Sequence, residues 1–519
     1  MSSSQANTSV PSGPRAGRRE WLGLAVLALP TVLLALDTSV LYLALPHLAT
    51  DLEPSSAQAL WAMDIYGFMI AGFLITMGTL GDRIGRRKLL LFGAGLFGAT
   101  SVLAAYSVSA EMLIAARAAQ GVAGATLMPA TLALISDMFL DPRQRAVAIA
   151  GWVSSFMTGI AIGPIVGGVL LEFFWWGSVF LLGVPVMVLL LILGPLVLPE
   201  RRSAEAGPLD LTSVGLSLAA LLPGIYALKR LAEDGLGTAP VLAGALGVAA
   251  GWLFLRRQRG LRTPLVDPSL FASVPFSAAL LLLLLGGTIE GGVTLFVTQY
   301  LQLIAGLSPL SAGLWLVPSA AAVIATSMVA PLAARRFPSG YVIAAGLLLS
   351  IAGLLVLTQV SSAGGLAGVV AGFTMLYAGG GPYGALGTDL VVGAAPPQKA
   401  GSAGSMAETV TELGAALGVA VLGSVGTAVY RQRMAGAVPD SVPPEAAGTS
   451  HDSLAGATAA AAELPPGAAA ELLDSARQAF TAGLNAAAGG GAAVAVALAV
   501  AAAVLLRNVR LGAGSGQCG

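Results

Sequence analysis

The sequence has very little of what soluble enzymes use for chemistry. Among its 519 residues there is one cysteine, Cys518, and there are two histidines, His47 and His451. A single cysteine excludes a disulfide within the chain and a thiolate metal site, and two isolated histidines offer no imidazole-based active site. We therefore expect no bound metal and no enzyme activity. The segment from His47 to Asp51 is interpreted as a plain loop.

Charged residues are equally scarce. Only 10% of the residues are charged and the net charge is zero, whereas a soluble domain carries about a quarter charged residues. The charges form short clusters between apolar runs, so there is no basic face that would indicate a nucleic-acid partner. An ATP-driven pump needs a phosphate-binding loop with a glycine before its lysine. No lysine follows a glycine here, since the three are Lys88 after Arg87, Lys229 after Leu228 and Lys399 after Gln398.

Hydrophobic residues are what the sequence has in excess. They make up 56% of the chain, and the mean hydropathy is +0.84. Apolar runs near twenty residues long recur from Trp21 to Leu506, and a helix of that length crosses a hydrocarbon layer of about 30 Å. We therefore predict an all-α polytopic membrane protein with fourteen transmembrane helices. They are expected near 20–45, 58–80, 88–108, 110–136, 144–170, 176–198, 209–230, 238–256, 275–302, 309–333, 340–360, 363–392, 399–430 and 478–506.

The distribution of Lys and Arg predicts the orientation in the membrane. If the N-terminus is cytoplasmic, 20 of the 26 basic residues fall on the cytoplasmic side, five fall outside, and Arg117 lies within a span. This bias favours an even number of helices with both termini in the cytoplasm. The first apolar run, after Arg18 and Arg19, is too long for a cleaved signal peptide, and Asp37 interrupts it.

Three segments are predicted to lie outside the membrane. Residues 1–19 and 507–519 are short cytoplasmic tails, and residues 434–477 form a long extracytoplasmic loop. Loops of that length are usually functional or disordered. Its end, with Pro465 and Pro466 before 468–477, is typical of a turn into a short amphipathic helix. The loop is either partly ordered against the mouth of the protein or a solvated linker.

One short connection, between the second and third predicted helices, combines glycines with charges. The glycines allow a tight connection with close helix approach, and an aspartate with arginines can form a charge-paired latch at the cytoplasmic surface. This ordered string resembles the signature loop of the major facilitator superfamily. The residues concerned are Gly78, Gly81, Asp82, Arg83, Gly85, Arg86, Arg87 and Lys88.

Three further segments are similar to motifs of the same superfamily. The run from Arg117 to Ala125 resembles its fourth-helix motif, and the resemblance implies a structural and proton-coupling role for Arg117. The run from Leu36 to Pro46 resembles the first-helix motif of the fourteen-helix drug:proton antiporter branch. A fifth-helix motif associated with antiporters is formed by Gly159, Gly163, Pro164, Gly167 and Gly168.

The resemblance extends from Trp21 to Leu506 and is closest to quaternary-ammonium, dye and multidrug efflux pumps. It implies two six-helix bundles, 20–198 and 275–506, separated by two additional central helices within 209–256. The fifth-helix glycines also have a meaning of their own. Because Gly159, Gly163 and Gly167 are four residues apart, they leave one helix face bare, so that a neighbouring helix can pack closely.

Five carboxylates fall inside predicted spans: Asp37, Asp64, Glu290, Glu408 and Glu412. An ionised carboxylate at depth is costly, so a proton or a cation should satisfy each of them. Glu408 and Glu412 are four residues apart and should share a helix face, where they would take up protons as a unit; alternatively the pair faces a solvated rim. All except Glu290 match acidic positions of the quaternary-ammonium pumps.

Buried acids without paired basic residues favour a cationic cargo. We therefore expect a proton-coupled multidrug efflux antiporter that exports lipophilic mono- and divalent cations, namely quaternary ammonium compounds, dyes and biocides. It would use the proton motive force and no cofactor, as a monomer in the bacterial inner membrane. The alternative is a dedicated antibiotic self-resistance or metabolite exporter of the same superfamily. Candidate cargo-binding side chains are Trp61, Tyr66, Phe156, Met157, Phe296, Tyr300, Trp315, Tyr377 and Tyr383.

Overall fold

The computed structural model describes residues 15–200, 210–234, 237–261, 268–394, 400–438, 442–507 and 509, and within these ranges the chain is helical, without strands. The first half contains α1 (Arg18–Leu52), α2 (Ser56–Ile84), α3 (Arg86–Ala105), α4 (Ala110–Met138), α5 (Pro142–Phe173), α6 (Ser178–Leu181) and α7 (Gly183–Val197). Next come α8 (Leu211–Asp234), α9 (Thr238–Gly260) and η1 (Pro268–Ala272). The rest consists of α10 (Val274–Gln299), η2 (Tyr300–Ile304), α11 (Pro309–Ala334), α12 (Ser339–Leu357), α13 (Leu366–Ala394), α14 (Ala400–Met434), α15 (Pro444–Asp452), α16 (Leu454–Ala462) and α17 (Pro466–Leu505).

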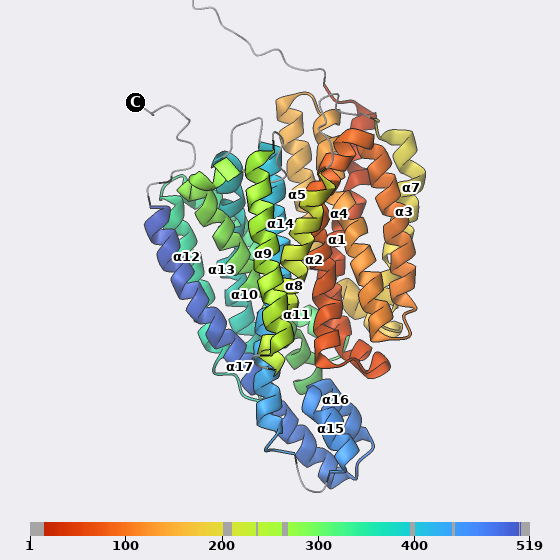
Figure 1. Cartoon of the computed structure of the whole chain (residues 1–519), viewed down its shortest axis with the longest axis vertical. Helices are drawn as coiled ribbons and strands as arrows, with labels where there is room; N and C mark the ends of the chain where they lie inside the picture. The colour runs from red at the N-terminus through yellow and green to blue at the C-terminus, as the bar shows by residue number, and fades with distance from the viewer. Residues whose placement is uncertain are drawn as a thin grey trace, which may run out of the picture.

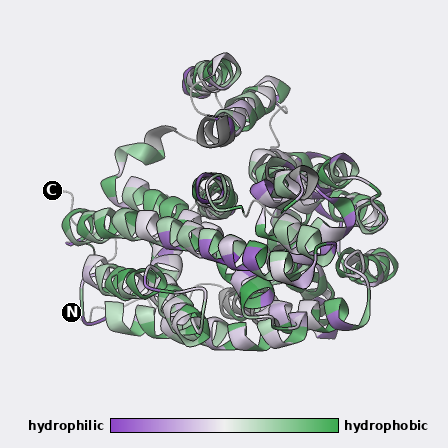
Figure 2. Cartoon of the chain, turned by 90° about the horizontal axis from the view of Figure 1, so that it is seen from below, coloured by the Kyte–Doolittle hydropathy of each residue, from purple (hydrophilic) through white to green (hydrophobic). Residues whose placement is uncertain are grey.

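The long helices run side by side and form one elongated bundle (Figure 1). The start of α1 and the end of α17 lie at one end of the bundle, which we call the terminal end, and α15 and α16 lie at the opposite end, the loop end. Hydrophobic residues run along most of the helices (Figure 2). The start of α2 follows capping chemistry: the Ser55 hydroxyl accepts from the Gln58 amide at 3.2 Å, and the Gln58 side chain accepts from the Ser55 amide at 2.9 Å.

The described helices make this a multi-pass membrane protein. Eleven of them are long and apolar enough to cross a membrane, and bent α5 makes twelve if it counts as one span. The predicted all-α membrane class is therefore confirmed. The number fourteen stays a prediction, because α8 and α13, which correspond to the predicted helices near 209–230 and 363–392, are outside those twelve.

Helices α1–α7 meet helices α10–α14 along a seam, where the closest approaches lie towards the loop end. A Cβ atom on Gly168 of α5 would lie 2.6 Å from the Cα of Leu310 in α11, and one on Gly313 would lie 2.1 Å from the Pro164 carbonyl oxygen. The Gln302 side chain donates to the Leu43 carbonyl oxygen at 3.0 Å. These contacts hold the two sets of helices together at the loop end.

The hairpin of α8 and α9 packs against this seam from one side. Leu218 of α8 packs directly against Gly72 of α2. A Cβ atom added to Gly72 would lie 2.5 Å from the Leu218 side chain. Phe68 of α2 belongs to the same apolar cluster as partly buried residues of α8 and α14. Asp210 and Arg257 pin the hairpin at the terminal end, with Nε–Oδ2 and Nη2–Oδ1 distances of 2.7 and 2.8 Å. Helix α8 therefore touches both sides of the seam.

The predicted extracytoplasmic loop, 434–477, is largely helical. The turn at Pro465 and Pro466 is confirmed, but the predicted short helix at 468–477 is not separate from the last span: the two form the continuous, 40-residue α17. Helix α15 docks on α14, where the Tyr430 hydroxyl donates to the Ser450 carbonyl oxygen at 2.8 Å, and α16 packs on α17. Leu454 and Ala457 of α16 are buried. The described part of this loop is therefore ordered against its neighbouring helices, and the position of a transport mouth stays a prediction.

One loop prediction is wrong. Residues His47 to Asp51 continue α1, which runs to Leu52. Two prolines, Pro30 and Pro46, lie inside this helix, and prolines are tolerated in membrane helices where neighbouring groups satisfy the freed carbonyls. The polar residues near the end of α1 extend the helix beyond the apolar run instead of breaking it.

Candidate functional site: a buried ion pair at the seam

Arg117 of α4 and Asp37 of α1 form an ion pair inside the bundle. Nη1 of Arg117 lies 2.7 Å from Oδ2 of Asp37, and their side chains are only 1% and 8% exposed. A guanidinium in the membrane interior costs about 2.5–3.5 kcal/mol on insertion scales unless acceptors compensate it. Asp37 supplies the opposite charge, and so each of the two charges makes the other tolerable.

Further contacts fix the orientation of Arg117. Its Nη1 also donates to Oε1 of Gln120 at 2.8 Å, and Nε2 of Gln120 donates to the Ser101 hydroxyl at 3.1 Å. The guanidinium carbon lies 4.2 Å from the centroid of the Tyr66 ring, a cation–π geometry. The Nε atom of Arg117 has no hydrogen-bonding partner among the described residues. The arginine therefore keeps one unused donor.

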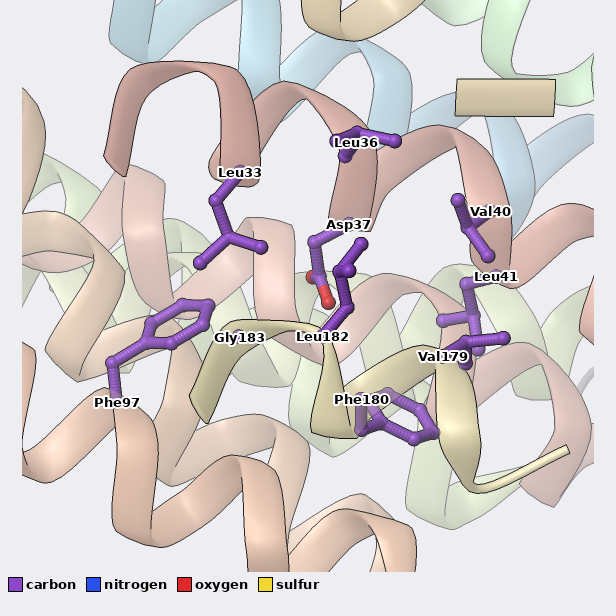
Figure 3. A pocket seen from close by; sticks show the side chains of 10 residues that line it. All are labelled: Leu33, Leu36, Asp37, Val40, Leu41, Phe97, Val179, Phe180, Leu182 and Gly183. Carbon is purple, nitrogen blue, oxygen red and sulfur yellow. The ribbon is translucent and has the colours of Figure 1, made fainter. Parts of the chain in front are cut away.

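Asp37 lies against apolar side chains on the side away from the seam. Figure 3 shows it pointing from α1 into a small space between Phe97 and Phe180. Leu33, also on α1, and Leu182, between α6 and α7, are among the other residues that line this space. Low polarity around a charge strengthens its interaction with an opposite charge. Loss of the negative charge on Asp37 therefore removes the counter-ion of Arg117 and leaves its contacts with Gln120 and Tyr66.

A second cavity, of about 50 Å³, joins this pair to the other half of the molecule. Arg117 and Tyr66 line it from one side, Tyr42 of α1 contributes to it, and Glu412 of α14 lines it from the other side. The Tyr66 hydroxyl has no hydrogen-bonding partner among the described residues. Both charges of the ion pair, and Glu412 as well, act electrostatically on Tyr66. A carboxylate of α14 thus shares one cavity with the buried arginine.

Two more predicted carboxylates, Asp64 and Glu408, lie on helices that line this cavity. Asp64 of α2 is 1% exposed and acts electrostatically on Tyr42, as does Glu412. Glu408 lies one turn before Glu412 on α14 and feels its charge. Asp37 and Glu412 therefore lie near Tyr66, Asp64 and Glu412 lie near Tyr42, and Glu408 lies one turn away from Glu412 on α14.

Glu290 lies apart from this group, on α10. Its surroundings come from α13, where Gly380 leaves room for the carboxylate and Tyr383 lies within hydrogen-bonding reach of it. Its Oε1 atom has no hydrogen-bonding partner among the described residues. Unlike Asp37, it forms no ion pair with a described residue.

At the terminal end, the predicted glycine-and-charge loop is the junction of α2 and α3. Gly85 has φ +115°, a conformation that residues with a Cβ rarely adopt, and a Cβ there would meet Glu200. The Arg86 guanidinium pairs with Asp137 at 2.8 Å and that of Arg87 with Glu200 at 3.4 Å. Arg83 is exposed, and the side chain of Asp82, the predicted latch partner, lies outside the described residues. Gly78 has only ordinary contacts.

The fifth-helix glycines face two different neighbours. A Cβ on Gly159 would lie 2.5 Å from the Val32 carbonyl oxygen of α1, and one on Gly167 would lie 2.7 Å from Val40 of the same helix. Gly168 faces α11 instead. Pro164 lies beside Gly313 of α11, and Gly163 is buried. The glycines therefore allow α5 to pack against α1 and across the seam at once.

The predicted aromatic residues divide into several groups. Tyr66 stacks on Arg117, whereas Trp315 is 45% exposed on the surface of α11. Phe296 packs on Phe480 at a centroid distance of 5.6 Å, towards the loop end. Tyr300 donates to the Ser361 carbonyl oxygen. Phe156 and Trp61 are partly buried, Tyr377 and Tyr383 lie near Glu290, and the side chain of Met157 is outside the described residues.

Sequence reasoning missed three residues of this site. Gln120 lies within the Arg117–Ala125 run, where its three-residue spacing from Arg117 was a usable signal, because it places both on one helix face. Ser101 and Tyr42 gave no signal of their own. They reach the site through helix packing between segments distant in the sequence.

A multi-pass helical bundle with charged groups between two sets of helices is an arrangement found in many secondary transporters. The sequence profile of the Major Facilitator Superfamily matches residues 27–419. The chain belongs to this superfamily.

Curated relatives match nearly the whole chain. The multidrug efflux pump LfrA of Mycolicibacterium smegmatis is 44% identical over 474 residues, which cover 91% of this chain and 94% of LfrA. The methyl viologen resistance protein SmvA of Salmonella typhimurium is 32% identical, covering 89% of this chain and 93% of SmvA. The tetracenomycin C resistance and export protein of Streptomyces glaucescens is also 32% identical, covering 90% and 88%.

A solved structure agrees with the fold. A bacterial homologue of the human lysosomal transporter Spinster, in an inward-facing and unoccupied conformation, matches with a TM-score of 0.63 over 95% of this chain and 99% of that chain. The two sequences are 17% identical. The similarity therefore concerns the fold alone.

Proposed function

We propose that this chain is a proton-coupled multidrug efflux antiporter that exports lipophilic mono- and divalent cations. The relatives named as a multidrug efflux pump and as a methyl viologen resistance protein support export of such compounds. The observation that carries the proposal is the buried pair of Asp37 and Arg117, which borders the same cavity as Glu412. Carboxylates in that position can hold either a proton or a cationic cargo.

The coupling that we propose runs through Arg117. While Asp37 is ionised, it holds Arg117 on the α1 side of the cavity, and Glu412 remains available to a cation. When Asp37 takes up a proton, Arg117 loses its counter-ion and turns its charge towards Glu412, which then releases the cation. Proton and cargo therefore exclude each other without sharing one carboxylate, which is the requirement for exchange.

The proposed arrangement in the membrane has fourteen spans, with α8 and α13 added to the twelve that length and composition support. It has a six-helix bundle at 20–198, two additional helices within 209–256 and a second six-helix bundle at 275–506. The terminal end would face the cytoplasm of a bacterium, and the seam contacts at the loop end would close the outer side. Rocking of the two bundles about the seam would then open the outer side.

Ethidium efflux provides the test of this function. Cells that express the chain should extrude ethidium faster than cells with the empty vector, and a protonophore should abolish the difference. Everted vesicles should accumulate ethidium when acidified inside. Efflux that continues unchanged with the protonophore would contradict proton coupling, and normal ethidium retention in expressing cells would contradict the cargo class.

Export of one particular antibiotic is the second candidate. The observation that favours it is the similarity to the tetracenomycin C resistance and export protein. A susceptibility panel separates the two functions: a dedicated exporter protects against one compound, whereas the proposed pump protects against several unrelated cations.

A further inference from the structure

Glu290 is an acidic group in the membrane interior that the coupling mechanism above does not use. Its Oε1 atom is buried and has no hydrogen-bonding partner among the described residues. No lysine, arginine or histidine occurs in 263–334 or 337–398, so α10 and α13 carry no basic residue at all. A positive charge for this carboxylate must therefore come from outside these helices. An ionised carboxylate without any positive partner is too costly at this depth.

The walls around Glu290 are aromatic. Tyr383 lies within hydrogen-bonding reach of the carboxylate, and Tyr377 lies close enough for the carboxylate charge to act on its hydroxyl. The Tyr377 ring packs on Phe373 at a centroid distance of 4.6 Å, and its hydroxyl is 2.9 Å from that of Thr294. These contacts hold the Tyr377 ring in a fixed orientation beside the charge.

Two glycines hollow out the space that the carboxylate and the Tyr383 ring occupy. A Cβ atom on Gly380 would lie 2.0 Å from Oε1 of Glu290, and one on Gly286 would lie 2.4 Å from the Tyr383 ring. The carboxylate therefore lies against the α13 backbone at Gly380. It could not lie there if residue 380 had a side chain.

Helices α10 and α13, which carry Glu290, Tyr377 and Tyr383, both pack against α14, the helix of Glu412. Tyr377 interacts electrostatically with Tyr42 of α1, and Tyr42 in turn feels the charges of Glu412 and Asp64. The group around Glu290 thus lies on helices that adjoin the helix lining the cavity of Arg117 and Glu412.

We propose that Glu290, Tyr377 and Tyr383 form a head-group subsite for the cationic centre of a lipophilic cargo, such as a quaternary ammonium or phosphonium group. The carboxylate supplies the charge, and the aromatic rings supply the faces that attract a large, weakly hydrated cation. A small metal cation would require several oxygen ligands in a closed shell, which two phenols and one carboxylate do not provide. This inference rests on the proposed function and assigns cargo recognition to the second half of the molecule.

Binding to the purified full-length chain in lipid nanodiscs tests the subsite. The probes are tetraphenylphosphonium and, as an uncharged analogue, triphenylphosphine oxide. Glu290→Gln should weaken tetraphenylphosphonium binding at least tenfold and leave binding of the uncharged analogue within twofold. A variant that weakens both probes equally would indicate a general collapse of the cavity and would overturn the proposal.

The chain offers a matched pair of glycine variants. Gly380→Ala should weaken tetraphenylphosphonium binding because the new methyl group displaces the flexible end of Glu290, which leaves the backbone in place. Gly384→Ala, one turn further along α13, meets nothing within 4 Å and should bind within twofold of the unmodified chain. A melting curve shows whether Glu290→Gln is folded. If it is not, Gly380→Ala still tests the subsite.

Failure of this inference and failure of the proposed function give different results. If the unmodified chain exchanges protons for ethidium and both Glu290→Gln and Gly380→Ala bind tetraphenylphosphonium normally, only the subsite is wrong. If the unmodified chain neither binds tetraphenylphosphonium nor transports ethidium, the proposed function is wrong and the subsite falls with it.

Discussion

The guanidinium of Arg117 lies over the ring of Tyr66, 4.2 Å from its centroid. The Tyr66 hydroxyl has no hydrogen-bonding partner among the described residues, so it is the ring that stabilises the arginine. We expect Tyr66→Phe to melt and transport as the unmodified chain does. Tyr66→Leu should lose about 1–2 kcal/mol of stability, because a desolvated cation–π contact is worth about that much. Melting curves of the two variants check this, and equal loss in both would show that the hydroxyl matters instead.

The pairing of Asp37 with Arg117 predicts non-additive stability. Removing one partner of a buried ion pair leaves an uncompensated charge and typically costs about 3–5 kcal/mol. Asp37→Asn and Arg117→Gln should each lower the melting temperature strongly, whereas the double variant should lower it less than either. A double variant whose loss equals the sum of the single losses would show that the two charges do not depend on each other.

The contact of α5 with α11 predicts a selective transport defect. Gly168 faces the Leu310 backbone with no room for a side chain, so Gly168→Leu should force the seam apart at the loop end at a cost of about 1–3 kcal/mol. Ethidium efflux should fall at least tenfold while binding persists. The neighbouring Val169 is 39% exposed, and Val169→Leu is the control that should transport normally. Native efflux by Gly168→Leu would mean that closure at this point is not needed.

The pin between α8 and α9 predicts a dependence on pH. Hydrogen bonds from the Arg257 side chain hold the pKa of Asp210 well below its usual range. Because the pKa of Asp210 is lower in the folded chain than in the unfolded chain, ionised Asp210 stabilises the fold at pH values above the ordinary pKa of an aspartate. This stabilisation is lost as the pH falls through the lowered pKa. The difference in melting temperature between the unmodified chain and Asp210→Asn should be full at neutral pH and shrink under strong acid. A difference that stays constant down to low pH would contradict this pairing.

The sequence predicted the helical membrane class, because runs of twenty apolar residues have few other uses. It placed Arg117 and Asp37 inside spans but did not pair them, since they are 80 residues apart and helix packing alone brings α1 and α4 together. Tyr66 was chosen as a cargo-binding aromatic residue, yet it stacks on Arg117. No local pattern distinguishes these two uses of a tyrosine.

Helix ends were harder to predict than helix centres. Residues His47 to Asp51 are polar enough to indicate a loop, but the backbone gains more from continuing its hydrogen bonds to Leu52. The same reason joins 468–477 to the last span in α17. Roles of the five carboxylates cannot be derived from their spacing, because the distinction between Asp37 and Glu290 depends on whether a positive charge lies opposite.

Proton release driven by ethidium is the most direct test of the account. Proteoliposomes that contain the chain and a pH-sensitive dye should show proton movement when ethidium is added on one side. The Asp37→Asn/Arg117→Gln variant, which keeps neutral side chains in place of both charges, should bind ethidium and move no protons. Proton movement in that variant at the rate of the unmodified chain would contradict the proposal that this ion pair couples the two fluxes.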